Sequence, residues 1–330
     1  MNNDDILFQI ESNLTGNKKV DIEYLHKEIA KYKAIGNIEL AQNIATLIVD
    51  YLKKEEIDEL RKQYERTKEN NIAKYNYAKS LSKEKKYNEA LPILEDLVFN
   101  FLKYFVRSDE ERYHFHELIE FALFYEMNNH PINVQTYQEP ITLYMHSLAE
   151  IYFFTERLDD AINILEQSLV FGPTDINNMV LLSVSYIAKN KIYECFEISK
   201  EILKYSYNKI QLATSYQNIG LYFAIHQKYD IAIACYLTSN YYVPNKRNLE
   251  KIIQITKQSG LIRFDTPEQI INVFHKYNIQ HGPSELVITT LKSFYESAKK
   301  MNNVKHQEYF NRIAKQLTDN ELDLAGKDNE

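Results

Sequence analysis

The residues best suited to chemistry form one cluster of imidazoles and carboxylates, His114, His116, Glu117 and Glu120. His116 and Glu120 are four residues apart, a spacing that places two side chains on one face of a helix. A metal site there would need at least one further ligand from elsewhere in the chain. Because the segment is predicted to be helical, an ordinary polar helix face is the favoured interpretation, and we expect no metal and no cofactor.

Motifs that cradle phosphates or activate a nucleophile do not occur in this sequence. It contains no GxGxxG, no P-loop and no GxSxG. With 7 glycines in 330 residues, a phosphate-binding loop is also hard to build. We therefore expect no catalytic residues and no enzyme activity. A helical enzyme built on His114, His116 and Glu120 is the least favoured alternative.

The charge and composition point away from nucleic acid and membranes. The formal net charge is −7, whereas a nucleic-acid binder needs an excess of Lys and Arg. No stretch reaches the roughly 18 apolar residues of a membrane-spanning helix, and Met1 to Ile10 lacks the apolar core of a signal peptide. Cys195 and Cys235 form neither a CxxC pair nor a zinc pattern. We expect a cytoplasmic protein, and the 26 Tyr and absent Trp suggest a low-GC bacterial genome.

The elements that position these residues are predicted to be helices joined by short turns. Only 7 Gly and 7 Pro occur, far fewer than strand-rich folds need for their turns. A helix-pair signature then recurs four times: a large residue, a small one, and Leu or an aromatic three further on, with a second small residue in the next helix. The small pairs are Ala78 and Ala90, Ala149 and Ala161, Ser183 and Cys195, and Gly220 and Ala232.

The spacing of these copies resembles that of the tetratricopeptide repeat (TPR) family. Ala161 and Cys195 lie 34 residues apart, and Cys195 and Ala232 lie 37 apart. The resemblance implies an all-α fold, a right-handed superhelical solenoid of antiparallel helix pairs. Pro173 and Pro244 are predicted to end the second helices of two pairs. The chain departs from the family in lacking a Trp at the head of the first helix.

Four regions follow from this pattern. We predict an N-terminal helical hairpin with a charged helix over 1–70, a TPR array with a helical insert at 101–140 over 71–245, degenerate TPR-like helices over 246–317, and a flexible tail over 318–330. In the hairpin, Ala30 and Ala41 are the candidate small contact residues. In the insert, Ser108 and Glu111 are predicted to form a capping box, with Phe115 on the apolar stripe of the helix.

The C-terminal half also resembles a group of TPR proteins from low-GC Gram-positive bacteria. The resemblance rests on three segments, namely the tyrosine-rich Tyr236 to Tyr242, Lys276 to Ile279, and Gly282 to Glu285. It implies a lineage and no particular activity.

In TPR arrays the first helix of each pair lines a concave groove, so the resemblance implies a binding surface. Its predicted side chains are Tyr75, Lys79, His146, Glu150, Phe153, Asn177, Val184, Gln217, Asn218 and Leu221. Such a mixture of amides and apolar groups suits an extended or helical peptide. A clamp for a terminal carboxylate is disfavoured, because Lys79 and Asn177 have no Arg beside them and Glu150 is acidic.

The predicted function is therefore a protein- or peptide-binding scaffold or adaptor, without nucleic-acid or membrane partners. The alternative is a peptide-sensing regulator that resembles the Rap-type receptors of Gram-positive bacteria. The related Rgg-type receptors carry an N-terminal helix-turn-helix domain, and residues 1–70 lack the turn glycine and short recognition helix of that motif. A homodimer through the charged helix at Ile57 to Thr67 is left open.

Overall fold

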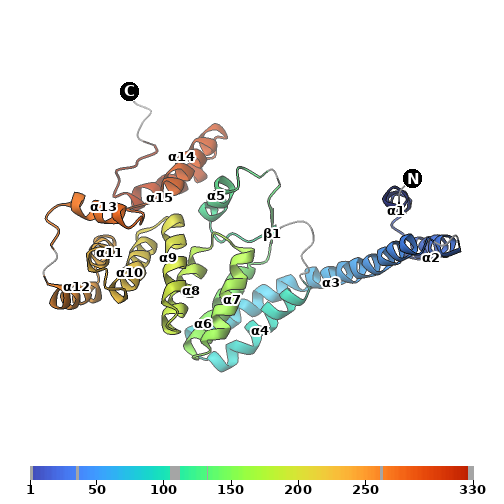
Figure 1. Cartoon of the computed structure of the whole chain (residues 1–330), viewed down its shortest axis with the longest axis horizontal. Coiled ribbons are helices and arrows are strands. Elements are labelled where there is room, and N and C mark those ends of the chain that lie inside the picture. The colour runs from blue at the N-terminus through green and yellow to red at the C-terminus, as the bar shows by residue number, and fades with distance from the viewer. Residues whose placement is uncertain (1–2, 35–36, 105–111, 132, 261–262, 326–330) are drawn as a thin grey trace. The chain divides into compact units, whose positions relative to one another are not determined.

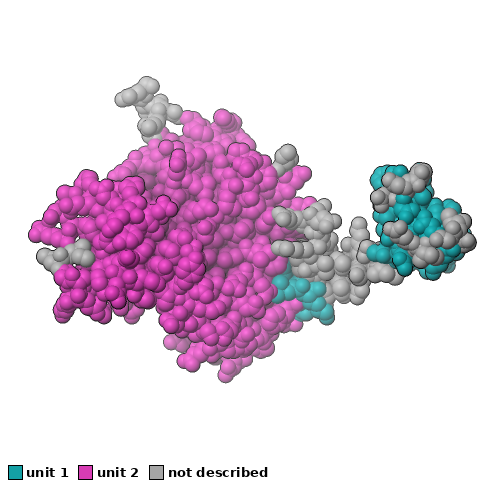
Figure 2. Space-filling view, in the orientation of Figure 1, with its two compact units in different colours: residues 1–71, 100–106 teal, residues 72–99, 107–330 magenta. Residues whose placement is uncertain are grey.

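The computed structural model describes residues 3–34, 37–104, 112–131, 133–260 and 263–325, which are almost entirely helical (Figure 1). Neighbouring helices pack in pairs, as predicted for an all-α chain. The chain forms two compact units, Met1–Asn71 with Asn100–Val106 and Ile72–Phe99 with Arg107–Glu330, which Figure 2 shows in two colours. Each unit is described by itself.

The first unit contains α1 (Asn3–Ser12), α2 (Lys18–Ala34) and the beginning of α3 (Ile38–Lys83). Its small core is formed by four buried aliphatic side chains, Ile10, Leu25, Leu40 and Ile44. The predicted hairpin is present, with Ala41 buried at the start of α3, but Ala30 is exposed. The charged helix is part of α3, and the side chains of Ile57, Leu60 and Tyr64 lie outside the described residues.

The second unit contains the helix pairs of the predicted repeats. The end of α3 is followed by α4 (Tyr87–Tyr104). Three further pairs then lie side by side in Figure 1, with each helix packed on the next: α6 (Ile141–Phe154) and α7 (Leu158–Phe171), α8 (Ile176–Ala188) and α9 (Ile192–Tyr205), and α10 (Lys209–Ile225) and α11 (Tyr229–Tyr242). Pro173 and Pro244 each stand two residues beyond a helix end, as predicted.

The small residues of the repeat signature sit where helices approach closely. All eight of them are buried. At Gly220, an added Cβ would lie 3.1 Å from the Cβ of Cys235 and 3.3 Å from the carbonyl oxygen of Ala232, so α10 and α11 nearly touch there. Cys195 is a buried small residue, as predicted, and burial raises the pKa of its thiol to about 11. The thiol is therefore protonated and unreactive at neutral pH.

The turns inside the helix pairs repeat the same backbone geometry. Lys85, Glu156, Asn190 and Gln227 adopt left-handed φ angles of 57–62°. In each turn the following N–H closes a hydrogen bond to the carbonyl five residues earlier, as in the Schellman motif: Lys86 to Leu81, Arg157 to Tyr152, Lys191 to Tyr186, and Lys228 to Phe223. The turns at 156, 190 and 227 keep the 34- and 37-residue spacing of the small residues, so the repeat is visible in the backbone itself.

These turns predict a stabilising substitution. Gln227→Gly and Glu156→Gly should each raise the free energy of unfolding by about 0.5–1 kcal/mol. Glycine removes the steric strain of a side chain at a left-handed φ angle, and this gain exceeds the extra conformational entropy that glycine loses on folding. Asn190→Gly is the matched control and should change less, since asparagine tolerates this conformation. Urea unfolding of the three variants measures the difference. Equal or lower stability of Gln227→Gly would contradict the assigned turn geometry.

The insert between the first and second pairs differs from its prediction. It contains a short parallel pair of strands, β1 (Arg112–Tyr113) and β2 (Gln135–Thr136), around helix α5 (Leu118–Met127). The helix begins later than predicted, so Phe115 and His116 precede it. Glu117 and Glu120 form the capping box that is present. The predicted box of Ser108 and Glu111 lies outside the described residues.

The C-terminal helices are α12 (Lys246–Ser259), α13 (Pro267–Lys276), α14 (Glu285–Lys300) and α15 (Val304–Leu317). The last two pack against each other as a pair. Beyond α15, Leu322 and Leu324 of the predicted flexible tail pack against the core, and the N–H of Leu324 donates to Asn311. Across the described residues, no helix combines the length and apolar character needed to cross a bilayer.

Candidate functional site

The candidate site is a cavity of about 500 Å³ on the first helices of three consecutive pairs, α3, α6 and α8. We call it the groove cavity. Its lining consists of Tyr75, Lys79, Leu143, His146, Ser147, Glu150, Asp175, Asn177, Val180, Leu181 and Val184. Aliphatic side chains come mainly from α8, whereas α6 supplies an imidazole and a carboxylate. The surface thus joins an apolar wall to a polar one.

Six of the ten predicted site residues meet in this cavity, namely Tyr75, Lys79, His146, Glu150, Asn177 and Val184. The other four do not line it. The side-chain oxygen of Gln217 accepts a 3.4 Å hydrogen bond from Asn245, and Phe153 and Leu221 are partly buried. Asn218 is buried and donates to Ser183 Oγ at 3.0 Å, so it joins α10 to α8 instead of facing a ligand.

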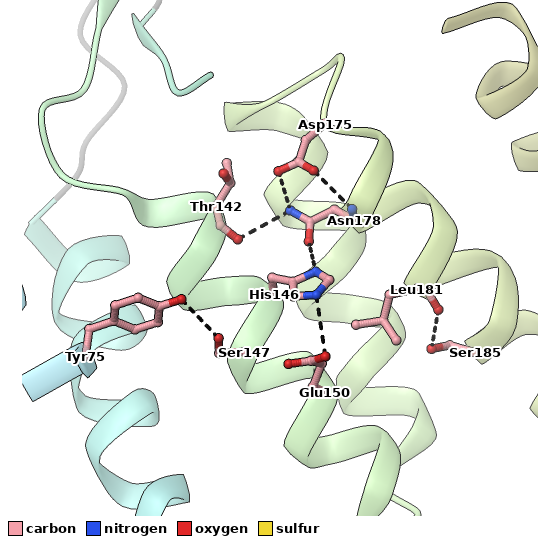
Figure 3. A network of polar contacts seen from close by, with 9 residues as sticks. All are labelled: Tyr75, Thr142, His146, Ser147, Glu150, Asp175, Asn178, Leu181 and Ser185. Carbon is pink, nitrogen blue, oxygen red and sulfur yellow. Dashed lines mark hydrogen bonds and ion pairs between the residues drawn. The ribbon is translucent and has the colours of Figure 1, made fainter. Parts of the chain in front are cut away.

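His146 is held by a hydrogen-bond network at the base of the groove cavity (Figure 3). Asn178 Nδ2 donates to the carbonyl oxygen of Thr142 at 3.3 Å and to Asp175 Oδ2 at 3.0 Å. Its Oδ1 is therefore the acceptor that faces His146 Nδ1, 2.7 Å away. The imidazole consequently carries its proton on Nδ1 and turns Nε2 toward Glu150, whose Oε1 lies 3.7 Å away.

This arrangement favours the charged form of His146. Burial by itself lowers the pKa of His146, but Glu150, Asn178 and Asp175 outweigh burial and raise the pKa above its ordinary value. Lys79 adds a second cation, with its Nζ 5.8 Å from the centre of the Tyr75 ring. The groove cavity therefore combines the Lys79 cation with an imidazole whose protonation is favoured, next to the partly exposed carboxylate of Glu150.

Glu150→Gln should lower the pKa of His146, because the substitution removes the carboxylate that stabilises the imidazolium. The stability that His146 contributes is present below its unfolded pKa and is lost as the pH rises through the raised folded pKa. NMR titration of the imidazole Cε1–H resonance measures the shift. Glu156→Gln, an exposed change in the turn after α6, is the control. An unchanged His146 pKa in Glu150→Gln would show that the 3.7 Å contact does not operate in solution.

The cluster of imidazoles and carboxylates singled out in the sequence makes contacts inside the protein. It consists of His114, His116, Glu117 and Glu120. His114 is buried with its Nδ1 2.6 Å from Thr142 Oγ1. Glu120 Oε2 accepts from the backbone N–H of His116 at 2.8 Å and of Glu117 at 3.3 Å, which caps α5. Burial, and next the neighbouring Asp175, raise the pKa of Glu120. His116 and Glu120 do not share a helix face, and within the described ranges no group of His, Cys, Asp and Glu is arranged to hold a metal.

Sequence reasoning missed the residues that organise the site, above all Asp175 and Asn178. Asp175 is the N-cap of α8, and its Oδ1 accepts from the N–H of Asn178 at 3.1 Å. An Asp directly before an apolar helical stretch is a recognisable start signal and could have been found. The contact between Asn178 and His146 joins residues 32 positions apart and has no local signal.

Comparison of the sequence with protein-family models gives no match, and comparison with curated proteins gives none either. The candidate site therefore rests on the residues and geometry described above.

Proposed function

We propose that this protein is a TPR-like scaffold that binds a peptide, or a segment of another protein, in the groove cavity. In this proposal the packed helix pairs form a right-handed superhelix whose first helices line a concave surface. The observation that carries the proposal is the origin of the lining. Its described residues lie on the first helices of three consecutive pairs, together with Asp175 at the N-cap of α8, and none lies on a second helix.

The chemistry of the lining supports a peptide ligand. Val180 and Val184 offer an apolar surface for ligand side chains, and the amide of Asn177 is exposed and free to bond a peptide backbone. Lys79 on α3 and Glu150 on α6 carry opposite charges and can pair with ligand charges of either sign. The described lining residues include no Arg, and Glu150 would repel a carboxylate, so a clamp for a terminal carboxylate remains disfavoured.

Affinity capture with matched variants tests this function. Val184→Lys places a charge on the apolar wall at a position that is already 37% exposed, so folding should be unaffected. Tyr193→Lys alters an exposed side chain of α9 outside the cavity. We expect Val184→Lys to reduce the yield of captured protein at least about tenfold, equivalent to about 1.4 kcal/mol, and Tyr193→Lys to leave it unchanged. Equal yields from the unaltered protein and both variants would count against the groove cavity as the binding surface.

The second candidate is a Rap-like regulator, in which a peptide bound in the groove controls an interaction of the N-terminal helices. The observation that favours it is the separate core of the first unit, built on Leu25, Leu40 and Ile44. Calorimetric titration with secreted peptides of the producing organism should then give saturable heat that Val184→Lys abolishes. Heat that persists unchanged in Val184→Lys would argue against this regulator.

A further inference from the structure

A second cavity, of about 680 Å³, lies in the C-terminal part of the second unit and shares no lining residue with the groove cavity. It is formed by α11 and by the loops before α13 and α14. Its lining is mostly aromatic and aliphatic, with Leu237, Tyr241, Tyr242, Phe264, Pro267 and Ile270. We propose that this aromatic cavity binds a small, uncharged aromatic molecule that carries a carbonyl oxygen.

One wall of the aromatic cavity is fixed by hydrogen bonds beneath it. The hydroxyl of Tyr216 donates to the carbonyl oxygen of Gln280 at 3.0 Å and accepts from the N–H of Gly282 at 2.7 Å. The ring of Tyr242 lies parallel to that of Tyr216, with 6.1 Å between centroids and 4° between planes. The loop and the aromatic ring are thus held in place without a ligand, which lowers the entropic cost of binding.

Two hydroxyl groups on this wall are available to a ligand. Thr238 and Tyr242 are one turn apart on α11, and both line the cavity. Thr238 is only 6% exposed, yet within the described residues neither its hydroxyl nor that of Tyr242 has a hydrogen-bond partner. Neither hydroxyl oxygen is among the fully buried, unpaired side-chain atoms of the described residues, so both are open to the cavity, and a ligand oxygen can accept hydrogen bonds from them. Burial raises the pKa of Tyr242 to about 12, which keeps its hydroxyl a donor at neutral pH.

The charges of the lining favour a neutral ligand. Asp265 is the one carboxylate among the lining residues, and it forms an ion pair with Arg263. Burial lowers the pKa of His281, which therefore contributes no fixed positive charge at neutral pH. A charged ligand would lose its hydration without gaining an unpaired counter-ion. The cavity volume falls in the range of small-molecule sites, about 300–1,000 Å³, and admits two fused rings.

Saturation-transfer NMR with 2-naphthamide and 2-naphthoate tests this inference. The two probes share their rings and nearly their shape, and they differ in charge. We expect 2-naphthamide to bind the full chain with a Kd of roughly 1 mM or tighter, and 2-naphthoate to bind at least about tenfold more weakly. Thr238→Val and Tyr242→Phe should each weaken 2-naphthamide about 3- to 10-fold, as expected for loss of one hydrogen bond.

Tyr193→Phe, on α9 outside the cavity, is the control and should bind like the unaltered protein. Thr238→Val should keep or raise the melting temperature, because it removes a hydroxyl without a protein partner, so weaker binding cannot be attributed to unfolding. Either of two results would overturn the inference: equal affinity for the two probes, or 2-naphthamide binding that neither variant weakens. Because the groove variant Val184→Lys leaves this cavity intact, failure here would not bear on the scaffold function.

Discussion

Asn178→Ala is expected to destabilise the second unit by about 3 kcal/mol. The substitution removes the partner that Asn178 provides to His146 Nδ1 and to Asp175 Oδ2, and it removes the second hydrogen bond of the carbonyl oxygen of Thr142, which lies within α6. Each buried polar group left unpaired costs about 1–3 kcal/mol. The loss also frees the imidazole to rotate away from the groove cavity. Urea unfolding followed by circular dichroism measures the change in stability.

Asn177→Ala is the matched control for this prediction. Asn177 is the neighbouring residue on α8, but its side chain is exposed and lines the groove cavity. Its removal should change stability by less than about 0.5 kcal/mol. If the two alanine variants were equally stable, the hydrogen-bond network of Figure 3 could not be what holds α8 against α6.

Glu139→Gln is expected to stabilise the protein at pH 8 by about 2 kcal/mol and to have no effect at pH 4. Glu139 is 4% exposed, one of its oxygens has no partner among the described residues, and burial raises its pKa from 4.5 to about 7. The folded state therefore holds a proton that the unfolded state releases between pH 4.5 and 7. Stability falls across that window, by about 1.4 kcal/mol per pH unit at most. Because glutamine cannot ionise, the Glu139→Gln variant does not lose this stability as the pH rises.

Unfolding curves of both proteins at pH 4 and pH 8 give the comparison. Glutamine keeps an oxygen that can accept from Tyr144, whose hydroxyl lies 3.4 Å from Glu139 Oε1. Glu194→Gln, an exposed change on α9, should be neutral at both values. If the difference in stability between Glu139→Gln and the unaltered protein were the same at pH 4 and pH 8, the carboxyl would have to be hydrated in solution.

The helix pairs could be predicted from the sequence because their determinants are local and periodic. Close helix contacts admit only small side chains, so Ala149, Cys195 and Gly220 report the crossing points directly. The start of α5 could not be predicted in this way. It follows the pairing of Arg112 with Gln135, a contact between segments 23 residues apart, and it is set by the capping box of Glu117 and Glu120.

Part of the candidate site could be predicted because the helical register is also local and periodic. The helical register places Tyr75, His146 and Val184 on the first helices, and these residues meet in the groove cavity. Register does not reveal which polar side chain turns inward. Asn218 donates to the small residue Ser183 of the preceding pair, and this inward contact could be seen only in three dimensions.

The most direct test of the scaffold function is site-specific photo-cross-linking in the producing cell. A benzophenone amino acid at position 184 lies on the apolar wall of the groove cavity, and the same residue at position 193 lies on α9 outside it. We predict a covalent adduct with a second polypeptide at 184, its loss when Glu150→Lys is added, and none at 193. Adducts at 193 and none at 184 would contradict the proposal that this groove is the binding surface.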